Sequence, residues 1–160
     1  MMAVFTAAEG LEMAMEIEKN GEVFYNEAAA KSADPEVKSL FEDLAAQERG
    51  HYRLFQRMLG DVKPALELPA AEYDQYEAYV QSALERALFA GPDKALALAG
   101  QARDREAALQ AALGFEKDTL LFFYDLREMV SEADRKTISN VIREEKKHLR
   151  RLAEMLHPGA

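Results

Sequence analysis

The chain has no cysteine among its 160 residues. This absence excludes disulfides, a thiol nucleophile, cysteine-ligated zinc and any iron–sulfur or rubredoxin-type centre within the chain. A metal held by this chain must therefore be bound by carboxylates and imidazoles. That ligand chemistry suits iron or manganese.

Basic residues and long apolar runs are also scarce. The sequence has 20 Lys and Arg against 29 Asp and Glu, a net charge of −9, which argues against nucleic acid and anionic membrane surfaces as partners. No stretch approaches the roughly 18 apolar residues of a membrane span, and residues 1–5 lack the basic and apolar regions of a signal peptide. The sequence predicts one cytoplasmic domain covering residues 1–160.

Helix signals fill most of the chain. Thr6 and Glu9 form a capping box that opens a helix expected to reach Lys31. Asp34-Pro35 begins a second helix, which is expected to run to Leu59 and stop at Gly60.

The later helices follow from the same signals. A helix is expected over residues 71–90, ended by Gly91-Pro92. The next is expected to start at Ala95 or Arg103 and reach Val130. The last is capped by Ser131 or Asp134 and runs to Leu156.

The lengths of the connections predict the topology of an all-α protein. The first two long helices and the last two are joined by very short turns, so each pair forms an antiparallel hairpin. The segment between the hairpins, with helix 71–90, is long enough to cross the bundle and bring the third long helix parallel to the second. This is the ferritin-like four-helix bundle with a long crossover. The sequence allows two placements of helix 71–90: it packs on its own bundle, or it swaps between protomers.

Glu-x-x-His occurs twice, and a single Glu lies about thirty residues before each copy. Residues three apart share one helix face, so each motif presents two ligands to one point. One Glu on each of two helices and Glu-x-x-His on each of two others is the ligand set of a carboxylate-bridged di-metal site. The predicted ligands are Glu18, Glu48, His51, Glu116, Glu145 and His148.

The ligands interrupt the apolar stripes of their helices. Glu48 and His51 lie between Leu44 and Phe55, and on the other helices an acid likewise replaces a core-facing residue near the middle. Four carboxylates in one core must be protonated or neutralised by cations. Two divalent ions balance four carboxylates with both histidines neutral, so the charge count favours two metals. His157 is expected to be a solvated residue.

Two further residues have two interpretations each, and a third has one. Gln47 and Glu144 each precede a ligand histidine by four positions, where they either hydrogen-bond its free ring nitrogen or are ordinary surface residues. Tyr25 lies two turns after Glu18 on the same face, within reach of a ligand carboxylate.

At these residues the chain resembles the rubrerythrin family of ferritin-like di-iron proteins, over essentially its full length. The likeness rests on Glu18 with Tyr25, and on the runs 45–51, 116–118 and 144–148. The resemblance implies a non-haem centre of two iron ions that reacts with peroxide or dioxygen. It assigns the ligand roles to the same six residues and implies a homodimer.

Two departures from that family narrow the expected activity. The best-known rubrerythrins carry a cysteine-ligated rubredoxin domain, so here the electrons must come from a separate donor such as a rubredoxin-type protein. Those proteins also have an acidic ligand where this chain has Thr119, which leaves the symmetric six-ligand set seen in bacterioferritin and favours iron oxidation.

Several functions remain open from the sequence. The first is an oxidoreductase that reduces peroxide or dioxygen or oxidises Fe(II), with iron or manganese as the metal, and hydroxylation of an organic substrate is a variant of it. The second is an iron-binding or iron-delivery protein without turnover. The third is a metal-free structural bundle that uses helix 71–90 for interaction.

Overall fold

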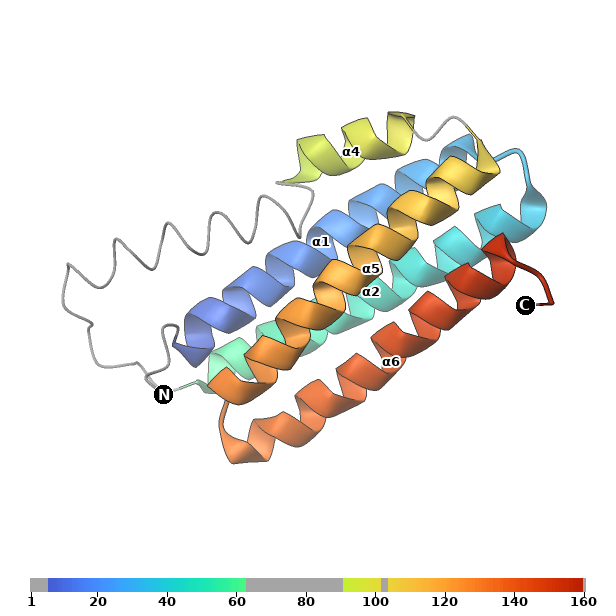
Figure 1. Cartoon of the computed structure of the whole chain (residues 1–160). Coiled ribbons are helices and arrows are strands. Elements are labelled where there is room, and N and C mark those ends of the chain that lie inside the picture. Colours follow the sequence, from blue (N-terminus) through green and yellow to red (C-terminus); the bar gives the residue numbers. More distant parts are fainter. Residues whose placement is uncertain (1–5, 63–90, 102–103, 160) are drawn as a thin grey trace.

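A computed structural model of the chain describes residues 6–62, 91–101 and 104–159 (Figure 1). Within these residues the regular structure is helical. The helices are α1 (Ala7–Lys31), α2 (Pro35–Asp61), α4 (Pro92–Gln101), α5 (Arg105–Met129) and α6 (Glu132–Leu156).

The long helices begin where the sequence predicts, because their N-caps satisfy the first free backbone amides. The Thr6 side chain accepts a hydrogen bond from the Glu9 amide, and the Glu9 carboxylate accepts one from the Thr6 amide, which completes the capping box. Asp34 caps α2 with Pro35 in the first helical position. Of the two caps considered for α6, the structure uses Ser131.

The four long helices form a bundle of two hairpins. Helix α1 is antiparallel to α2, and α5 is antiparallel to α6, while α5 runs in the same direction as α2 (Figure 1). The short α4 lies along α1 on the outside of the bundle. The predicted ferritin-like bundle is therefore confirmed, and the parallel placement of α5 agrees with a long crossover. The predicted helix 71–90 lies outside the described residues.

Three predicted boundaries are wrong, one of them only by a single residue: α5 ends at Met129, and Val130 is its C-cap. Helix α2 does not stop at Gly60 but continues to Asp61, because Gly60 takes helical geometry and the chain turns away only at Val62. The third long helix does not start at Ala95 or Arg103. Residues 92–101 form the separate helix α4, and α5 begins at Arg105 because the Asp104 carboxylate accepts the Ala107 amide at 2.7 Å.

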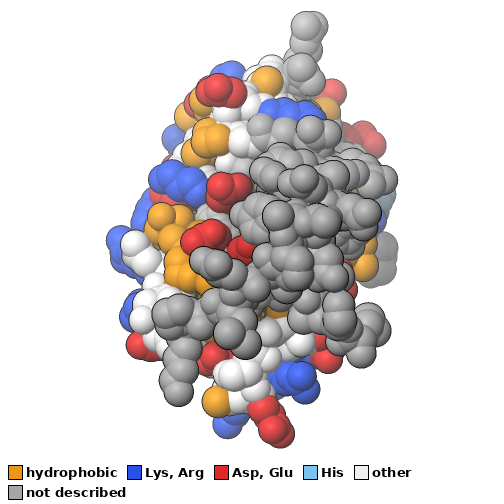
Figure 2. Space-filling view, turned by 90° about the vertical axis from the view of Figure 1, so that its left-hand side faces the viewer, with side chains coloured by type: hydrophobic (Ala, Val, Ile, Leu, Met, Phe, Trp, Pro, Cys, Tyr) orange, Lys and Arg blue, Asp and Glu red, His pale blue; other side chains and the backbone are white. Residues whose placement is uncertain are grey.

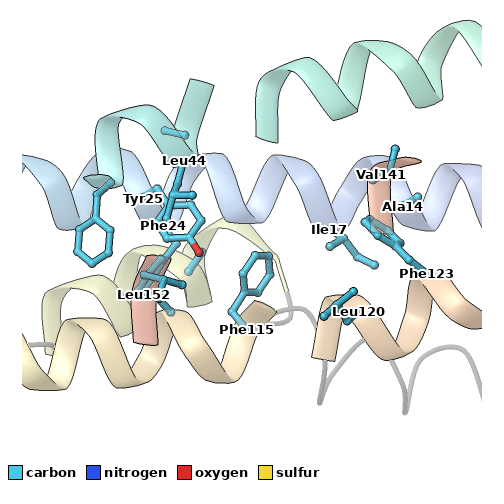
Figure 3. Close-up of a cluster of buried hydrophobic side chains, with 14 of the residues drawn as sticks. Ala14, Ile17, Phe24, Tyr25, Leu44, Phe115, Leu120, Phe123, Val141 and Leu152 are labelled. Carbon is cyan, nitrogen blue, oxygen red and sulfur yellow. The ribbon is translucent and has the colours of Figure 1, made fainter. Parts of the chain in front are cut away.

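The core consists of two apolar layers at different heights along the bundle (Figure 3). One gathers around Tyr25 and Phe24, and the other around Ile17 and Phe123. Edge-on aromatic contacts stabilise both, with ring centroids 5.4 Å apart for Phe24 and Tyr25 and 5.3 Å for Phe55 and Phe123. On each long helix, the predicted metal ligands lie between the residues that contribute to these two layers.

The face shown in Figure 2 carries acidic, basic and small apolar groups side by side over its described part. None of the described helices is long and apolar enough to cross a membrane. The single domain over residues 1–160 and the homodimer remain predictions.

Candidate metal centre

The six predicted ligands meet in the middle of the bundle. Helix α1 supplies Glu18, α5 supplies Glu116, and α2 and α6 each supply one Glu-x-x-His pair. Their side chains are fully shielded from solvent except for His51, which is 5% exposed. Side chains from opposite ends of the sequence thus converge because each lies on the core-facing stripe of its helix.

The donor atoms form two groups that share two residues. In each group one nitrogen or oxygen atom from every member lies within 4.8 Å of the others. Both groups contain Glu48 and Glu145; one adds Glu18 and His51, and the other adds Glu116 and His148. This is the arrangement expected when two carboxylates are shared between two cations and each cation has its own Glu and His.

Glu145 shows the sharing most clearly. Its Oε1 lies 2.7 Å from His51 Nδ1, and its Oε2 lies 3.0 Å from His148 Nδ1. The two imidazole rings are stacked, with centroids 5.9 Å apart. The two oxygen atoms of one carboxylate therefore serve two different groups of ligands.

Most buried polar atoms of the centre have no hydrogen-bond partner outside the six residues in the described structure. The unpartnered atoms include both oxygens of Glu18, Glu48 and Glu145, one oxygen of Glu116, and Nδ1 of both histidines. A buried polar group without a partner costs about 1–3 kcal/mol, and a buried charge costs more. So many lone pairs directed at one place fit a pair of cations, and the all-oxygen and imidazole donor set fits iron or manganese.

The pKa shifts show how the charge is met by protons when no cation is bound. Burial raises the pKa of Glu48 and of Glu116 well above the usual value, and the neighbouring carboxylates add to this. Burial lowers the pKa of His51, but the charges of Glu18 and Glu145 outweigh burial and raise it to about 12. The pKa of His148 is raised for the same reason, by Glu116, Glu145 and Glu48. Without cations, the centre therefore retains protons.

The outer nitrogen of each histidine is held by the opposite hairpin. His51 Nε2 lies 2.6 Å from Glu144 Oε2, and His148 Nε2 lies 2.8 Å from Gln47 Oε1. Of the two interpretations of Gln47 and Glu144, the structure shows the hydrogen bond to a ligand histidine, but the histidine lies on the facing helix and not four positions later on the same helix. The imidazole rings extend across the gap between α2 and α6, so each Nε2 meets the residue just before the ligand Glu of the facing helix.

These bonds orient both imidazoles toward the centre. The Gln47 Nε2 amide donates to Asp43 Oδ2 at 2.9 Å, so Gln47 Oε1 faces His148 and accepts a hydrogen bond from Nε2–H. The Glu144 carboxylate likewise accepts from His51 Nε2. Nδ1 is then the ring atom that faces the carboxylates. It carries a proton when no cation is bound, and a cation that replaces this proton would take its lone pair.

Tyr25 connects the two hairpins from inside the core. Its hydroxyl donates a hydrogen bond to Glu116 Oε1, which confirms that Tyr25 reaches a ligand carboxylate, one from the opposite hairpin. Burial and the charge of Glu116 raise the pKa of Tyr25 well above its usual value. The phenol therefore keeps its proton and holds it at the ligand.

Gly21 was not singled out from the sequence. A Cβ at this position would lie 2.9 Å from two ring atoms of Phe115 and 3.2 Å from Glu48 Oε2. The glycine thus lets α1 approach α5 and the shared carboxylate closely. The available signal was a glycine in the middle of a helix, where it costs about 0.5–1 kcal/mol relative to alanine.

Three other residues have clear positions in the structure, and two of them, Thr119 and His157, were already noted in the sequence. Thr119 is fully buried one turn after Glu116, and its hydroxyl has no hydrogen-bond partner in the described part of the chain. Tyr124 lies outside the centre, under the side chains of Arg127 and Lys146. His157 is exposed at the end of α6, as predicted.

The bundle and the converging acids and histidines define a ferritin-like protein with a metal centre of the carboxylate type. Residues 9–156 match the family model described as Rubrerythrin, and the chain belongs to the rubrerythrin family.

A solved structure is similar to this chain over nearly its full length. It is a crystal structure of a Thermotoga maritima protein proposed to be a ferritin-like diiron-carboxylate protein. The two chains are 26% identical with a TM-score of 0.71, and the match covers 98% of this chain and 97% of that one. Among curated proteins, no sequence matches this chain significantly.

Proposed function

We propose that this protein is a non-haem di-iron oxidoreductase that reduces peroxide or dioxygen, oxidises Fe(II), or both, in the handling of iron and oxidative stress. The observation that carries the proposal is the set of unpartnered lone pairs on six buried residues, divided into two groups that share Glu48 and Glu145. The similarity to a protein proposed to be of the diiron-carboxylate class supports the same metal.

The six residues would hold the metal pair, with Glu48 and Glu145 shared, and with Glu18 and His51 on one ion and Glu116 and His148 on the other. When bound, an iron pair supplies two electrons, the number needed to reduce one peroxide to two waters with two protons. The protein's own part is geometric and electrostatic.

The surrounding residues fix that geometry. Glu144 and Gln47 hold the two imidazoles by their outer nitrogens, and Tyr25 holds Glu116 and keeps a proton beside it. The apolar layers on either side of the centre exclude water, and the carboxylates between them are accordingly fully shielded from solvent. A dry, rigid centre favours reaction at the metals over loss of ligands to solvent.

Electrons must come from outside the chain. It has no cysteine for an iron–sulfur centre, so sustained peroxide reduction requires a separate donor, such as a rubredoxin-type protein. Fe(II) oxidation needs no such donor, because the substrate iron itself supplies the electrons.

The test compares peroxide consumption by three iron-loaded, reduced proteins under a chemical reductant. The wild type is expected to consume peroxide over many cycles, and Glu145→Ala is expected not to, because it lacks an acid shared by both ions. Glu154→Ala is the matched control, since it removes an exposed glutamate from the same helix, and it should behave as the wild type. Equal consumption by the wild type and Glu145→Ala overturns the proposal.

A second assay with the same proteins distinguishes a catalyst of Fe(II) oxidation from a protein that only binds iron. Repeated additions of Fe(II) in air should be oxidised each time by an enzyme, at an unchanged rate. If the protein oxidises only the first two Fe(II) ions per chain and none of the later additions, it is an iron-binding or iron-delivery protein without turnover.

A further inference from the structure

The two groups of ligands are chemically identical, but their neighbours are not. Each has one Glu and one His of its own, and both use Glu48 and Glu145. The differences lie in the groups that hydrogen-bond these ligands, and such outer groups change metal affinity by about 10–100-fold.

The first difference concerns the two histidines. His51 Nε2–H donates a hydrogen bond to the Glu144 carboxylate, whereas His148 Nε2–H donates one to the neutral amide oxygen of Gln47. A carboxylate partner makes the imidazole a stronger electron donor to a metal at Nδ1 than an amide does.

The network behind Gln47 adds little negative charge to the His148 side. Its amide is held by Asp43, and Asp43 accepts a hydrogen bond from Arg151 Nη1 at 2.5 Å. The guanidinium offsets the charge of Asp43, so this side is close to neutral beyond the histidine. Glu144 makes no such ion pair with a lysine or arginine in the described structure, and its charge reaches His51 directly.

The second difference concerns the two terminal carboxylates. Glu116 Oε1 already accepts the Tyr25 hydroxyl, which takes up electron density that a cation would otherwise use. Neither oxygen of Glu18 accepts a hydrogen bond from a group outside the six ligands in the described structure. The sequence explains this difference. Tyr25 lies seven positions after Glu18 and bonds Glu116 of the opposite hairpin. The corresponding residue of that hairpin, seven positions after Glu116, is Phe123, which has no hydroxyl to donate to Glu18.

Both differences act in the same direction. We infer that the two metal positions are unequal: the Glu18–His51 position binds the first divalent cation tightly, and the Glu116–His148 position binds the second more weakly and exchanges it. This inference rests on the paired metal centre of the proposed function. It makes the weaker position the one at which incoming Fe(II) binds as substrate.

The buried tyrosine should contribute more than the histidine partners. The Tyr25–Glu116 hydrogen bond is fully enclosed, whereas the Glu144 side chain is 50% exposed and its charge is screened by water. Loss of the Tyr25 hydroxyl should therefore tighten the second binding step by about 10–100-fold, and each change at Gln47 or Glu144 should move its own step by about tenfold.

Cobalt(II) is a suitable probe because it is coloured when bound and is stable without reductant. Metal-free protein is titrated anaerobically, and heat and visible absorption are followed together. The wild type is expected to show two steps, at one and at two equivalents, with affinities that differ by about tenfold or more. A crystal grown with one equivalent should show its anomalous cobalt peak beside His51.

The variants then identify the cause. Tyr25→Phe should tighten the second step only. The exchange Gln47→Glu with Glu144→Gln keeps composition and net charge, and it should bring the two steps together by weakening the first and tightening the second. Circular dichroism and thermal unfolding of the metal-free variants show that both still fold.

The outcomes separate this inference from the proposed function. Two ions bound with equal affinity, a first peak beside His148, or a wild-type isotherm in both variants would overturn the inequality and leave the paired centre intact. Failure of the folded wild type to bind cobalt or iron would overturn the paired centre and this inference together.

Discussion

The middle of the bundle and the apolar layers on either side of it satisfy their buried groups in opposite ways. In the layers, residues such as Phe24 and Phe123 are enclosed by other apolar side chains and need nothing further. In the middle, four acids and two histidines are equally buried but leave most of their lone pairs unpartnered in the described structure. The layers account for folding, and the middle is kept, at a cost to stability, for binding cations.

The strongest way to break this comparison is to remove a shared ligand while keeping its shape. Glu48→Gln should weaken binding of both ions by more than about 100-fold each, which is over about 5 kcal/mol for the pair. The metal-free protein should become more stable, because a buried carboxylate with a strongly raised pKa is replaced by a neutral amide. Metal analysis and thermal unfolding of the metal-free form measure the two effects. A variant that is less stable and still binds two ions would contradict the comparison.

The converse change removes packing from a layer and leaves the middle intact. Leu126 is fully buried on α5, ten residues or about 15 Å beyond Glu116. Leu126→Ala should lower the free energy of unfolding by about 2–5 kcal/mol. Denaturant unfolding should show this loss with and without metal, and the number of bound ions should not change. A loss of metal without a loss of stability would mean that the two regions are not separable.

The pH dependence of stability should sharpen the contrast. The raised pKa of His51, about 12 against 6.5 when unfolded, contributes stability that is fully present below pH 6.5 and is lost as the pH rises toward 12. The raised pKa of Glu48 acts in the same direction above pH 4.5. The metal-free protein should therefore become less stable between pH 6.5 and 9.

Metal binding should change oppositely over the same range, because cations compete with those protons for the same lone pairs. The difference in melting temperature between metal-loaded and metal-free protein should grow from pH 6.5 to pH 9. Parallel thermal scans at several pH values measure it. A constant or shrinking difference would show that the protons of the centre are not displaced by metal.

The smallest expected effect concerns the close approach at Gly21. Gly21→Ala must displace the Phe115 ring and Glu48, so it should lower stability by about 1 kcal/mol or more and weaken metal binding. Gly50→Ala is the matched control in α2, where a Cβ meets nothing within 4 Å, and it should stabilise by about 0.5–1 kcal/mol. Thermal unfolding should therefore show a lower melting temperature for Gly21→Ala and a higher one for Gly50→Ala. A stabilising Gly21→Ala with normal metal binding would show that the contact has no role.

Much of the fold could be predicted from local signals. The capping box at Thr6 and the Asp34-Pro35 start act within a few residues, so the sequence alone specifies them, and it narrowed the cap of α6 to Ser131 or Asp134. The convergence of the Glu-x-x-His pairs followed because helical spacing and the apolar stripes determine which face a residue occupies.

The errors came from features that depend on contacts between helices. The partners of His51 and His148 lie on the facing helix, and spacing along one helix cannot reveal them. The role of Gly21 depends on a ring from α5 and a carboxylate from α2. The start of α5 was placed at Ala95 or Arg103 instead of Arg105 for a different, local reason: the helical pattern runs on through the Asp104 cap.

The paired centre itself is tested most directly by diffraction from crystals loaded anaerobically with excess Fe(II), with data collected at the iron absorption edge. The account predicts two anomalous peaks in each chain, about 3.5–4 Å apart, with Glu48 and Glu145 between them. One should lie beside Glu18 and His51, and the other beside Glu116 and His148. A single peak, or peaks elsewhere while these six side chains keep their places, would contradict it.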